Sequence, residues 1–271
     1  MLPTIKLGDK KITRLILGGD PFCGNSHRTP ELNEEMKDYF TTEKIKETLF
    51  HAQECGINAM QLRGDTHMLR VIREFRNEGG HLYWIAETAS EYLSHVGNVN
   101  QIVQSGADAI YHHPSRTDNL FKEKKYEELK DRLKIIRESG KLVGLGTHIP
   151  EVITHAEEYN WDIDFYVASV YNISKIDRVS MAILGEINQG EPFDDEDRPR
   201  MYQAVQSTDK PCLLFKILGD GRRCNSKEEI KKAFSEAYQN IKPTDALIVG
   251  VFPQDKDQVC ENIELVDSIL K

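Results

Sequence analysis

Short apolar runs alternate with segments of helical spacing along the whole chain. Between the runs, apolar residues recur every three or four positions, as in Ile45, Leu49 and Ala52, which is typical of amphipathic helices. The runs are rich in β-branched and aromatic residues, as buried strands are; they are RLILGG (14–19), INAMQ (57–61), HLYWIAE (81–87), ADAIYHH (107–113), KLVGLG (141–146), IDFYVAS (163–169), CLLFK (212–216) and ALIVG (246–250). The pattern predicts eight strands, each followed by a helix.

Eight such units in 271 residues favour a (β/α)8 TIM barrel, formed as a single domain over residues 1–271. The segment TIKLGDKKITRL predicts an N-terminal β-hairpin that turns at Gly8 and Asp9 and closes the barrel floor. A doubly wound open sheet is the alternative. The first strand is followed by GGDPFCG, which lacks the GxGxxG spacing, so the dinucleotide fingerprint of that alternative is missing.

Charge and composition exclude several classes of partner. The formal net charge is −9, so a broad surface for the phosphate backbone is not expected and nucleic acid is an unfavourable partner. The chain begins without an apolar leader and has no run near the roughly 18 apolar residues that span a bilayer, which predicts no membrane contact. Five scattered cysteines without C-x-x-C pairing predict reduced thiols and a cytoplasmic protein.

Polar side chains gather where the apolar runs end. Because strand ends converge at the C-terminal rim of a barrel, these residues predict a pocket for a small-molecule substrate. Arg63 or Lys216 would hold an anionic group of the substrate, and Lys216 could instead form a Schiff base or an ion pair with Glu87 or Asp20. The rim set is Asp20, Gln61, Arg63, Asp65, Glu87, His112, His113, His148, Tyr171 and Lys216.

Three of these residues end consecutive predicted strands and could hold a metal. Glu87, His113 and His148 offer a carboxylate and two imidazoles, a ligand set suited to zinc or another divalent ion. Side chains alternate along a strand, so only one of His112 and His113, and one of Glu87 and Thr88, can point inward. The alternative is that these residues are hydrogen-bonded rim residues without a metal.

The order and spacing of several segments resemble the aldo-keto reductases. The similar stretches are the hairpin with LILGGDPFCG, CGINAMQ, WIAET, GADAIYHHP, LVGLGTH, FYVASVYN, FKILGDG and ALIVGVFPQDKDQVCENIELV, which together cover most of the chain. The resemblance implies a barrel that passes hydride from a nicotinamide to a carbonyl, while a tyrosine protonates the oxygen. A lysine and an aspartate would tune that tyrosine, and a histidine would orient the substrate.

The catalytic residues implied by the resemblance are largely replaced. The aspartate position falls on Gln61, the tyrosine has no counterpart in LRGDTH, and the lysine position falls on Glu87 or Thr88. The histidine remains, as His113 or His112. Loss of a positioned general acid forfeits roughly 10²- to 10⁴-fold in rate, so the usual reductase mechanism is not expected.

The same resemblance implies positions for NADP. Thr147 and Ser169 would meet the carboxamide, beside the Tyr171–Asn172 pair, and Glu261 and Asn262 would approach the adenine. The stretch GVFPQDKDQ offers Lys256 but no arginine for a 2′-phosphate.

Two long connections complete the pattern. Residues 20–40 carry Cys23 and His27 and are long enough to form a lid over the barrel mouth. Cys23 and His27 lie four residues apart in that connection, which fixes no nucleophile geometry. Residues 187–203 are strongly acidic and are expected to be solvated.

Three functions remain open. The first is a small-molecule enzyme with a replaced redox tetrad, in which Glu87 or His113 acts as acid or base and a divalent metal could assist. The second is an NAD(P)-dependent oxidoreductase that uses an unusual acid such as Tyr171. The third is a noncatalytic protein that binds a nucleotide or a partner.

Overall fold

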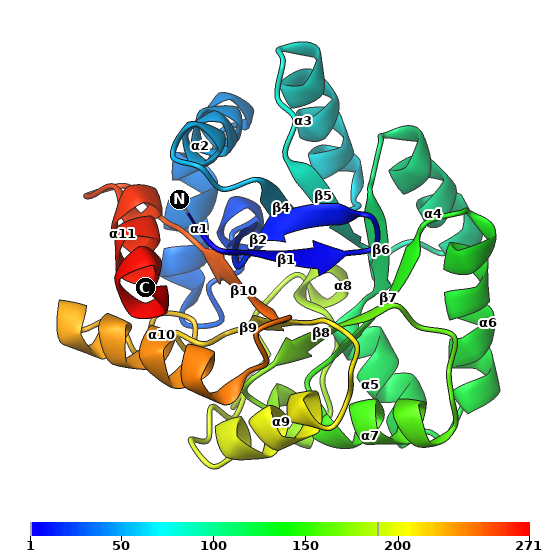
Figure 1. Ribbon diagram of the computed structural model, residues 1–271. Helices are drawn as coiled ribbons and strands as arrows, with labels where there is room; N and C mark the ends of the chain where they lie inside the picture. Colours follow the sequence, from blue (N-terminus) through cyan, green and yellow to red (C-terminus); the bar gives the residue numbers. More distant parts are fainter. Residues whose placement is uncertain (1, 189) are drawn as a thin grey trace.

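Eight parallel strands close into a barrel (Figure 1). The computed structural model describes residues 2–188 and 190–271, so Met1 and Gln189 of the predicted domain lie outside the described residues. The strand order is β10-β3-β4-β5-β6-β7-β8-β9, and β10 pairs with both β3 and β9. The strands are β3 (Leu15–Gly18), β4 (Ala59–Arg63), β5 (Tyr83–Glu87), β6 (Ala109–His112), β7 (Leu142–Thr147), β8 (Phe165–Ser169), β9 (Cys212–Phe215) and β10 (Ala246–Gly250). The predicted (β/α)8 barrel is confirmed, and each predicted strand overlaps one barrel strand.

Helices surround the barrel and bury their apolar faces against it. In α2, for example, Ile45, Leu49 and Ala52 are fully buried, as their spacing predicts. No helix within the described ranges is both long and apolar enough to cross a membrane. The helices are α1 (Pro30–Tyr39), α2 (Thr42–Glu54), α3 (Thr66–Asn77), α4 (His95–Gln104), α5 (Pro114–Lys122), α6 (Tyr126–Glu138), α7 (Pro150–Glu158), α8 (Met181–Leu184), α9 (Asp197–Gln206), α10 (Lys227–Asn240) and α11 (Gln258–Leu270), with short 3-10 turns η1 (Asp20–Cys23) and η2 (Ile173–Lys175).

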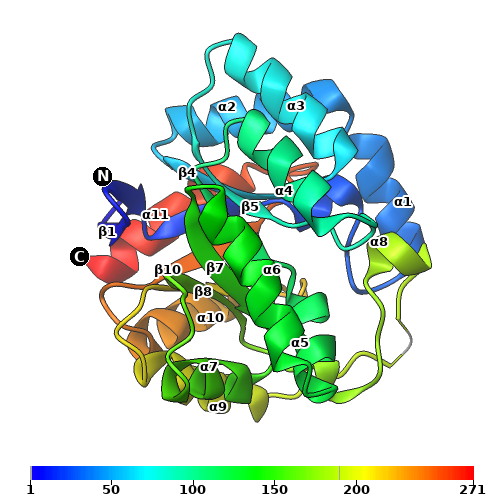
Figure 2. The same cartoon turned by 90° about the vertical axis from the view of Figure 1, so that its right-hand side faces the viewer.

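The predicted N-terminal hairpin closes one end of the barrel. Strands β1 (Thr4–Leu7) and β2 (Lys10–Thr13) pair antiparallel around a turn at Gly8, whose φ of 60° suits glycine. Ile5, Leu7 and Ile12 belong to the same buried cluster as the residues inside the barrel. The hairpin lies at one end of the molecule and α8 at the other (Figure 2). The hairpin therefore closes the end of the barrel opposite α8.

Alternation along the strands fills the barrel interior. Ile85, Tyr111, Phe165 and Val167 belong to the interior cluster, while their chain neighbours Trp84, Ile110 and Tyr166 pack in the helix-facing core. Gly144 gives Tyr111 and Phe165 their room, because a Cβ atom there would lie 2.4 Å from Phe165 Cζ and 2.5 Å from Tyr111 Cβ. Tyr111 in turn supports the candidate site above it.

Substitution of Gly144 by alanine is expected to destabilise the protein by about 1 to 3 kcal/mol, because the barrel interior has no space for the methyl group. Chemical denaturation of the wild type and G144A would measure this loss. G97A is the control, since Gly97 lies in the first turn of α4, where an added Cβ would meet only Ser94, at 3.2 Å from Oγ and 3.4 Å from Cβ. An unchanged midpoint for G144A would contradict the close packing described.

Candidate active site

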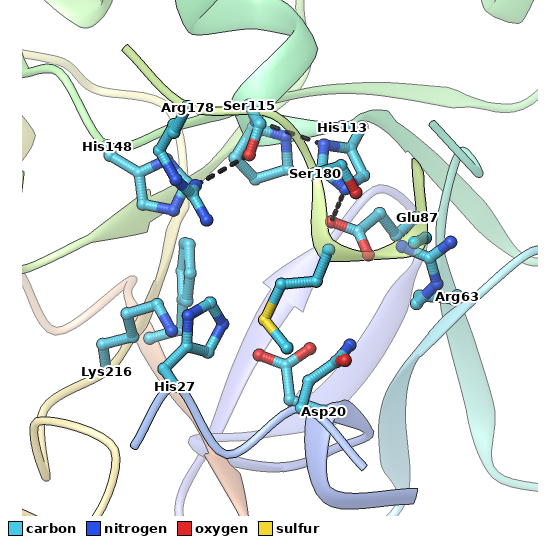
Figure 3. Close-up of a pocket in the computed structure, with 15 residues that line it drawn as sticks. Asp20, His27, Arg63, Glu87, His113, Ser115, His148, Arg178, Ser180 and Lys216 are labelled. Atoms are coloured by element: carbon cyan, nitrogen blue, oxygen red, sulfur yellow. Dashed lines mark hydrogen bonds and ion pairs between the residues drawn. The ribbon is translucent and has the colours of Figure 1, made fainter. Parts of the chain in front are cut away.

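A small polar cavity lies at the C-terminal mouth of the barrel, beneath α8 (Figure 3). Its volume is about 50 Å³, room for a few water molecules or one small functional group. The ends of several strands and the segment around α8 supply its wall. The lining residues are Asp20, Asn25, His27, Arg63, Glu87, His113, Pro114, Ser115, His148, Arg178, Ser180, Met181, Ala182, Phe215 and Lys216.

Strand alternation decides which member of each adjacent pair faces the cavity. His113 lines it, whereas His112 points outward, where its Nδ1 lies 2.8 Å from Thr117 Oγ1. Glu87 also lines the cavity, and Thr88 instead accepts the backbone N–H of His113 at 3.0 Å. His112 therefore lines neither cavity, and its side chain is used in a hydrogen bond outside the barrel.

Glu87 is a buried carboxyl group that holds its proton near neutral pH. Burial raises the pKa of Glu87 to about 8, although the Arg63 guanidinium favours the ionised form. Arg63, Glu87 and Tyr111 lie side by side in register across β4, β5 and β6. Tyr111 shares a hydrogen bond with the Glu87 carboxyl, and Gln61 Nε2 donates to Tyr111 Oη at 2.7 Å. Gln61 thus acts on Glu87 through Tyr111.

His113 faces Glu87 as a neutral imidazole. Its Nδ1 accepts the backbone N–H of Ser115 at 3.1 Å and caps the start of α5, so the ring proton resides on Nε2. That Nε2 lies 3.8 Å from Glu87 Oε1. Burial, together with Arg63 and nearby cations and imidazoles, lowers the pKa of His113 well below its usual value. Its Nε2–H is therefore a donor available to a ligand.

His148 forms a dyad with a buried aspartate. Its Nδ1 donates to Asp118 Oδ2 at 2.7 Å, which leaves Nε2 as the unprotonated nitrogen. Asp118 is fully buried and also accepts hydrogen bonds from Thr147 Oγ1 and Ser174 Oγ, each at 2.6 Å. Burial lowers the pKa of His148, against the opposing effect of Asp118. His148 is therefore a neutral acceptor oriented by a carboxylate.

The predicted cations have carboxylate partners. Arg63 donates to Asp65 at 3.0 Å and to Glu91 at 2.6 Å. Lys216 pairs with Asp220 rather than with Glu87 or Asp20. Asp65 accepts the N–H of Met68 at 2.9 Å and so caps α3. It does not line the cavity, but it holds Arg63, which does.

The segment around α8, which covers the cavity, contributes Arg178 to its wall. Arg178 Nη1 donates to Ser115 Oγ at 2.8 Å and Nη2 to Glu191 Oε1 at 2.7 Å, while its buried Nε has no hydrogen-bond partner among the described residues. Burial alone would raise the pKa of Glu191, but His27 and Arg178 hold it at about 2. The expectation that residues 187–203 are solvated is wrong for Glu191, whose side chain is buried in its ion pairs with His27 and Arg178.

The segment around α8 also forms hydrogen bonds to the barrel loops on the other side of the cavity. Ser90, in the loop after β5, donates to Ser180 Oγ at 2.6 Å. His27 Nδ1 lies 2.7 Å from Glu191 Oε2, which joins the 20–40 connection to the same segment. Residues of the 20–40 connection and of the segment around α8 therefore line the cavity, and Glu191 joins these two parts of the chain from behind.

A second, larger cavity adjoins the first. It measures about 420 Å³ and lies between the ends of β3, β9 and β10. Asp20, Asn25, Phe215 and Lys216 line both cavities. Gln61, Arg28 and Gln258 add polar groups to its wall. A molecule could reach from one cavity into the other past Asp20 and Lys216.

Several residues assigned through the resemblance lie outside both cavities. Thr147 Oγ1 donates to Asp118, and Ser169 Oγ donates to the carbonyl of Tyr171 at 2.8 Å. Tyr171 Oη accepts from Arg198 at 2.9 Å, and the Asn172 backbone donates to Asp197 at 3.0 Å. None of these four lines either cavity described here. Each of the groups named here has a hydrogen-bond partner within the fold, and a role of these four residues in cofactor binding stays a prediction.

The two positions assigned to the adenine also lie outside the cavities. Glu261 lies near Lys256 at 3.4 Å and Lys227 at 3.5 Å. Neither Glu261 nor Asn262 lines the larger cavity, although Gln258 of the same helix does. Their role in cofactor binding stays a prediction.

The predicted metal triad does not converge. Within the described residues, one group of histidine, cysteine and acidic side chains lies close enough to share an ion, and it is His51, Cys55 and Cys260. Although Glu87, His113 and His148 line one cavity, their ligand atoms do not all lie within 4.8 Å of one another.

The expectation of reduced thiols is wrong for one pair of cysteines. Cys55 and Cys260 form a disulfide across a sequence separation of 205 residues, with Cα atoms 6.3 Å apart. Cys23, Cys212 and Cys224 are free. Burial raises the pKa of the Cys23 thiol, which makes it a poor nucleophile.

Sequence reasoning missed Arg178, Asp118 and Tyr111. Asp118 lies four residues after Pro114, one turn into α5, and Tyr111 lies two positions before His113 on the inward face. Strand alternation alone could have identified Tyr111. Arg178 lies in an irregular segment whose sequence gives no periodic signal.

Comparison with known proteins supports the fold alone. The sequence matches no family model and no curated protein. An aldo-keto reductase from Bacillus halodurans, in its holo form, superposes with a TM-score of 0.63 at 13% identity and covers 98% of this chain and 91% of that chain. A truncated 3-deoxy-D-arabino-heptulosonate 7-phosphate synthase from Thermotoga maritima gives 0.57 at 17% identity, covering 99% and 91%. The Yersinia pestis dihydropteroate synthase gives 0.55 at 9% identity, covering 100% and 98%. These enzymes of different classes share the barrel.

Proposed function

We propose that this protein is a small-molecule enzyme that moves a proton on a small anionic substrate. The observation that carries the proposal is that Glu87 and His148 line one small cavity, where the Glu87 carboxyl holds a proton and the Nε2 atom of His148 does not. Pairs of titratable groups whose surroundings separate their proton affinities mark the acid and the base of an active site. The resemblance to aldo-keto reductases enters this proposal only through the barrel and its hairpin.

His148 is the proposed base. Its Nε2 carries the lone pair, and Asp118 both fixes the ring and stabilises the imidazolium that forms when a proton is taken up. The low proton affinity of the buried ring is offset in the reaction by the adjacent carboxylate. Asp118 is a positioning residue, because it acts through His148.

Glu87 is the proposed acid. With a pKa of about 8 it is mostly protonated at neutral pH, so it can donate a proton and then recover it from solvent. His113 supports it by donating Nε2–H to a developing oxyanion. A neutral imidazole suits this role, because it polarises a carbonyl without carrying charge of its own.

The substrate is proposed to be a small carboxylate or phosphate with a carbonyl group. Arg178 offers an unsatisfied buried Nε–H, and Lys216 adds a cation at the boundary of the two cavities. The small cavity has room for the reacting group, and the larger cavity can take the remainder. Isomerisation, epimerisation or elimination beside the carbonyl fits this arrangement.

Proton exchange in D₂O tests the proposal without knowledge of the full reaction. Short 2-oxo acids and small sugar phosphates would be incubated with the protein, and proton NMR would follow loss of the C–H signal beside the carbonyl. We expect exchange with at least one compound, and a decrease of about 10²- to 10⁴-fold in H148N. The control is H67N, which changes an exposed histidine outside both cavities. Exchange with no compound, or undiminished exchange in H148N, would contradict the proposal.

Nicotinamide-dependent reduction is the second candidate, and the larger cavity is the observation that favours it. At about 420 Å³, that cavity lies where loops after the last two strands of such barrels often bind phosphate groups. Fluorescence of added NADPH, followed with and without aldehydes, distinguishes the candidates. Consumption of NADPH without proton exchange would favour reduction.

A further inference from the structure

Two helix ends on the outside of the barrel bring four metal-ligating side chains together. His51 and Cys55 lie one turn apart at the end of α2, and Asp257 and Cys260 lie at the start of α11, which packs against α2. One ligand atom from each of His51, Cys55 and Cys260 lies within 4.8 Å of the others. We propose that these four residues bind a zinc-class divalent cation when the Cys55–Cys260 disulfide is reduced.

The distances from His51 to the two sulfurs fit a tetrahedral site between the helix ends, in which the sulfurs separate once the disulfide is reduced. His51 Nε2 lies 3.7 Å from Cys55 Sγ and 3.8 Å from Cys260 Sγ. Zinc–sulfur and zinc–nitrogen bonds of standard length at a tetrahedral angle place nitrogen and sulfur about 3.5 Å apart. His51 therefore meets both sulfurs at nearly the spacing that one shared ion requires.

Asp257 supplies the fourth ligand. Its Oδ2 lies 2.8 Å from His51 Nε2, and its Oδ1 accepts the N–H of Cys260 at 3.0 Å. One carboxylate oxygen therefore caps α11 while the other lies at hydrogen-bond distance from the His51 ring, and it would turn to the ion when His51 Nε2 binds the metal. The start of α11 also places the positive end of the helix dipole at Cys260, which stabilises a thiolate there.

The site is accessible and separate from the barrel mouth. The side chains of His51 and Asp257 are 43% and 46% exposed. None of the four residues lines either cavity of the candidate active site. The proposal therefore does not rest on the proposed enzymatic function.

The disulfide and the metal-bound form exclude each other. A water-soluble trialkylphosphine reduces the disulfide: the sulfur–sulfur bond accepts two electrons and two protons, and the phosphine becomes its oxide by taking oxygen from water. The cation then displaces one proton from each thiol, and both protons pass to solvent. Neutral His51 binds through Nε2 and carries its proton on Nδ1.

Cobalt is a suitable probe, because tetrahedral thiolate coordination gives it visible and near-ultraviolet absorption that zinc lacks. The full chain would be reduced with the phosphine under nitrogen, freed of excess reagent and titrated with Co²⁺. We expect one Co²⁺ per chain, a thiolate-to-cobalt band, and loss of that band when Zn²⁺ is added. The bands should be absent from C55S, C260S and H51A but retained in C224S, which removes an exposed free cysteine.

Alkylation gives a second readout that needs no absorption band. In the reduced chain, Zn²⁺ should protect Cys55 and Cys260 from iodoacetamide while Cys224 still reacts, as mass spectrometry would show. D257N should weaken Co²⁺ binding by about tenfold or more. Circular dichroism would show that each variant is folded. A fully reduced chain without the band, binding retained in H51A, or unchanged affinity in D257N would overturn the four-ligand site.

Discussion

The Glu87→Gln variant is expected to lose turnover by about 10²- to 10⁴-fold and yet to gain stability in mild alkali. The amide has nearly the shape of the protonated acid, so it can still accept from Tyr111 and stay beside His113. It has no proton to release to a substrate. The proton-exchange assay would measure the loss of turnover.

The gain in stability follows from the raised pKa of Glu87. Between the ordinary glutamate pKa near 4.5 and the folded-state pKa of about 8, the folded protein keeps a proton that the unfolded chain has released. The folded state therefore binds more protons over this range, and its stability falls as pH rises from about 4.5 to about 8. A pKa difference of this size corresponds to a few kcal/mol.

The glutamine variant lacks this loss of stability. Thermal unfolding at pH 5 and pH 9 should show that the advantage of E87Q over the wild type is larger at pH 9. E54Q is the matched control, because Glu54 is exposed at the end of α2 and should show no such pH dependence. Equal unfolding temperatures for E87Q and the wild type at pH 9, with the same relation at pH 5, would mean that Glu87 is not a buried acid.

The barrel could be predicted because each of its strands is marked by a short apolar run of neighbouring residues. Segments such as INAMQ and IDFYVAS are apolar enough to be buried on both faces, and a helix of amphipathic spacing follows each strand. The hairpin was equally local, since Gly8 and Asp9 separate two short alternating strands. Local patterns of this kind fix the order of elements, and the order of eight strand-helix units leaves few ways to close a sheet.

The wall of the site could be predicted in part, because strand ends must converge in a barrel. Gln61, Arg63, Glu87, His113 and Lys216 all line one of the two cavities. Whether His112 or His113 lines the cavity depends on which face of β6 points inward. Every residue of β6 is buried, so the hydrophobic pattern does not distinguish the two faces.

Partners across the site could not be predicted. Lys216 pairs with Asp220 because the chain turns at Lys216, whose φ is 63°, and brings the two side chains together. Arg178 enters the cavity from an irregular segment, and its position depends on Ser115 and Glu191. Such contacts arise from the tertiary arrangement of loops, which has no periodic signature.

The pairing of Cys55 with Cys260 has the same origin, since 205 residues separate two cysteines that meet only when α2 and α11 pack together. This separation leads to the second large expected effect. Reduction of the disulfide, without metal, is expected to lower the free energy of unfolding by about 2 to 5 kcal/mol, because the unfolded chain regains the freedom of a long closed loop. The unfolding temperature should fall by roughly 5 to 15 °C.

Scanning calorimetry of the oxidised and the phosphine-reduced chain would measure this change. Zn²⁺ should restore much of the lost stability in the reduced wild type, since an ion that binds the folded state alone stabilises it. The C55S variant should unfold like the reduced wild type whether or not phosphine or Zn²⁺ is present, while C224S should behave like the wild type throughout. If the oxidised and reduced chains unfold at the same temperature, the disulfide does not join α2 to α11 in solution, and the proposed cation would have no loss of stability to reverse.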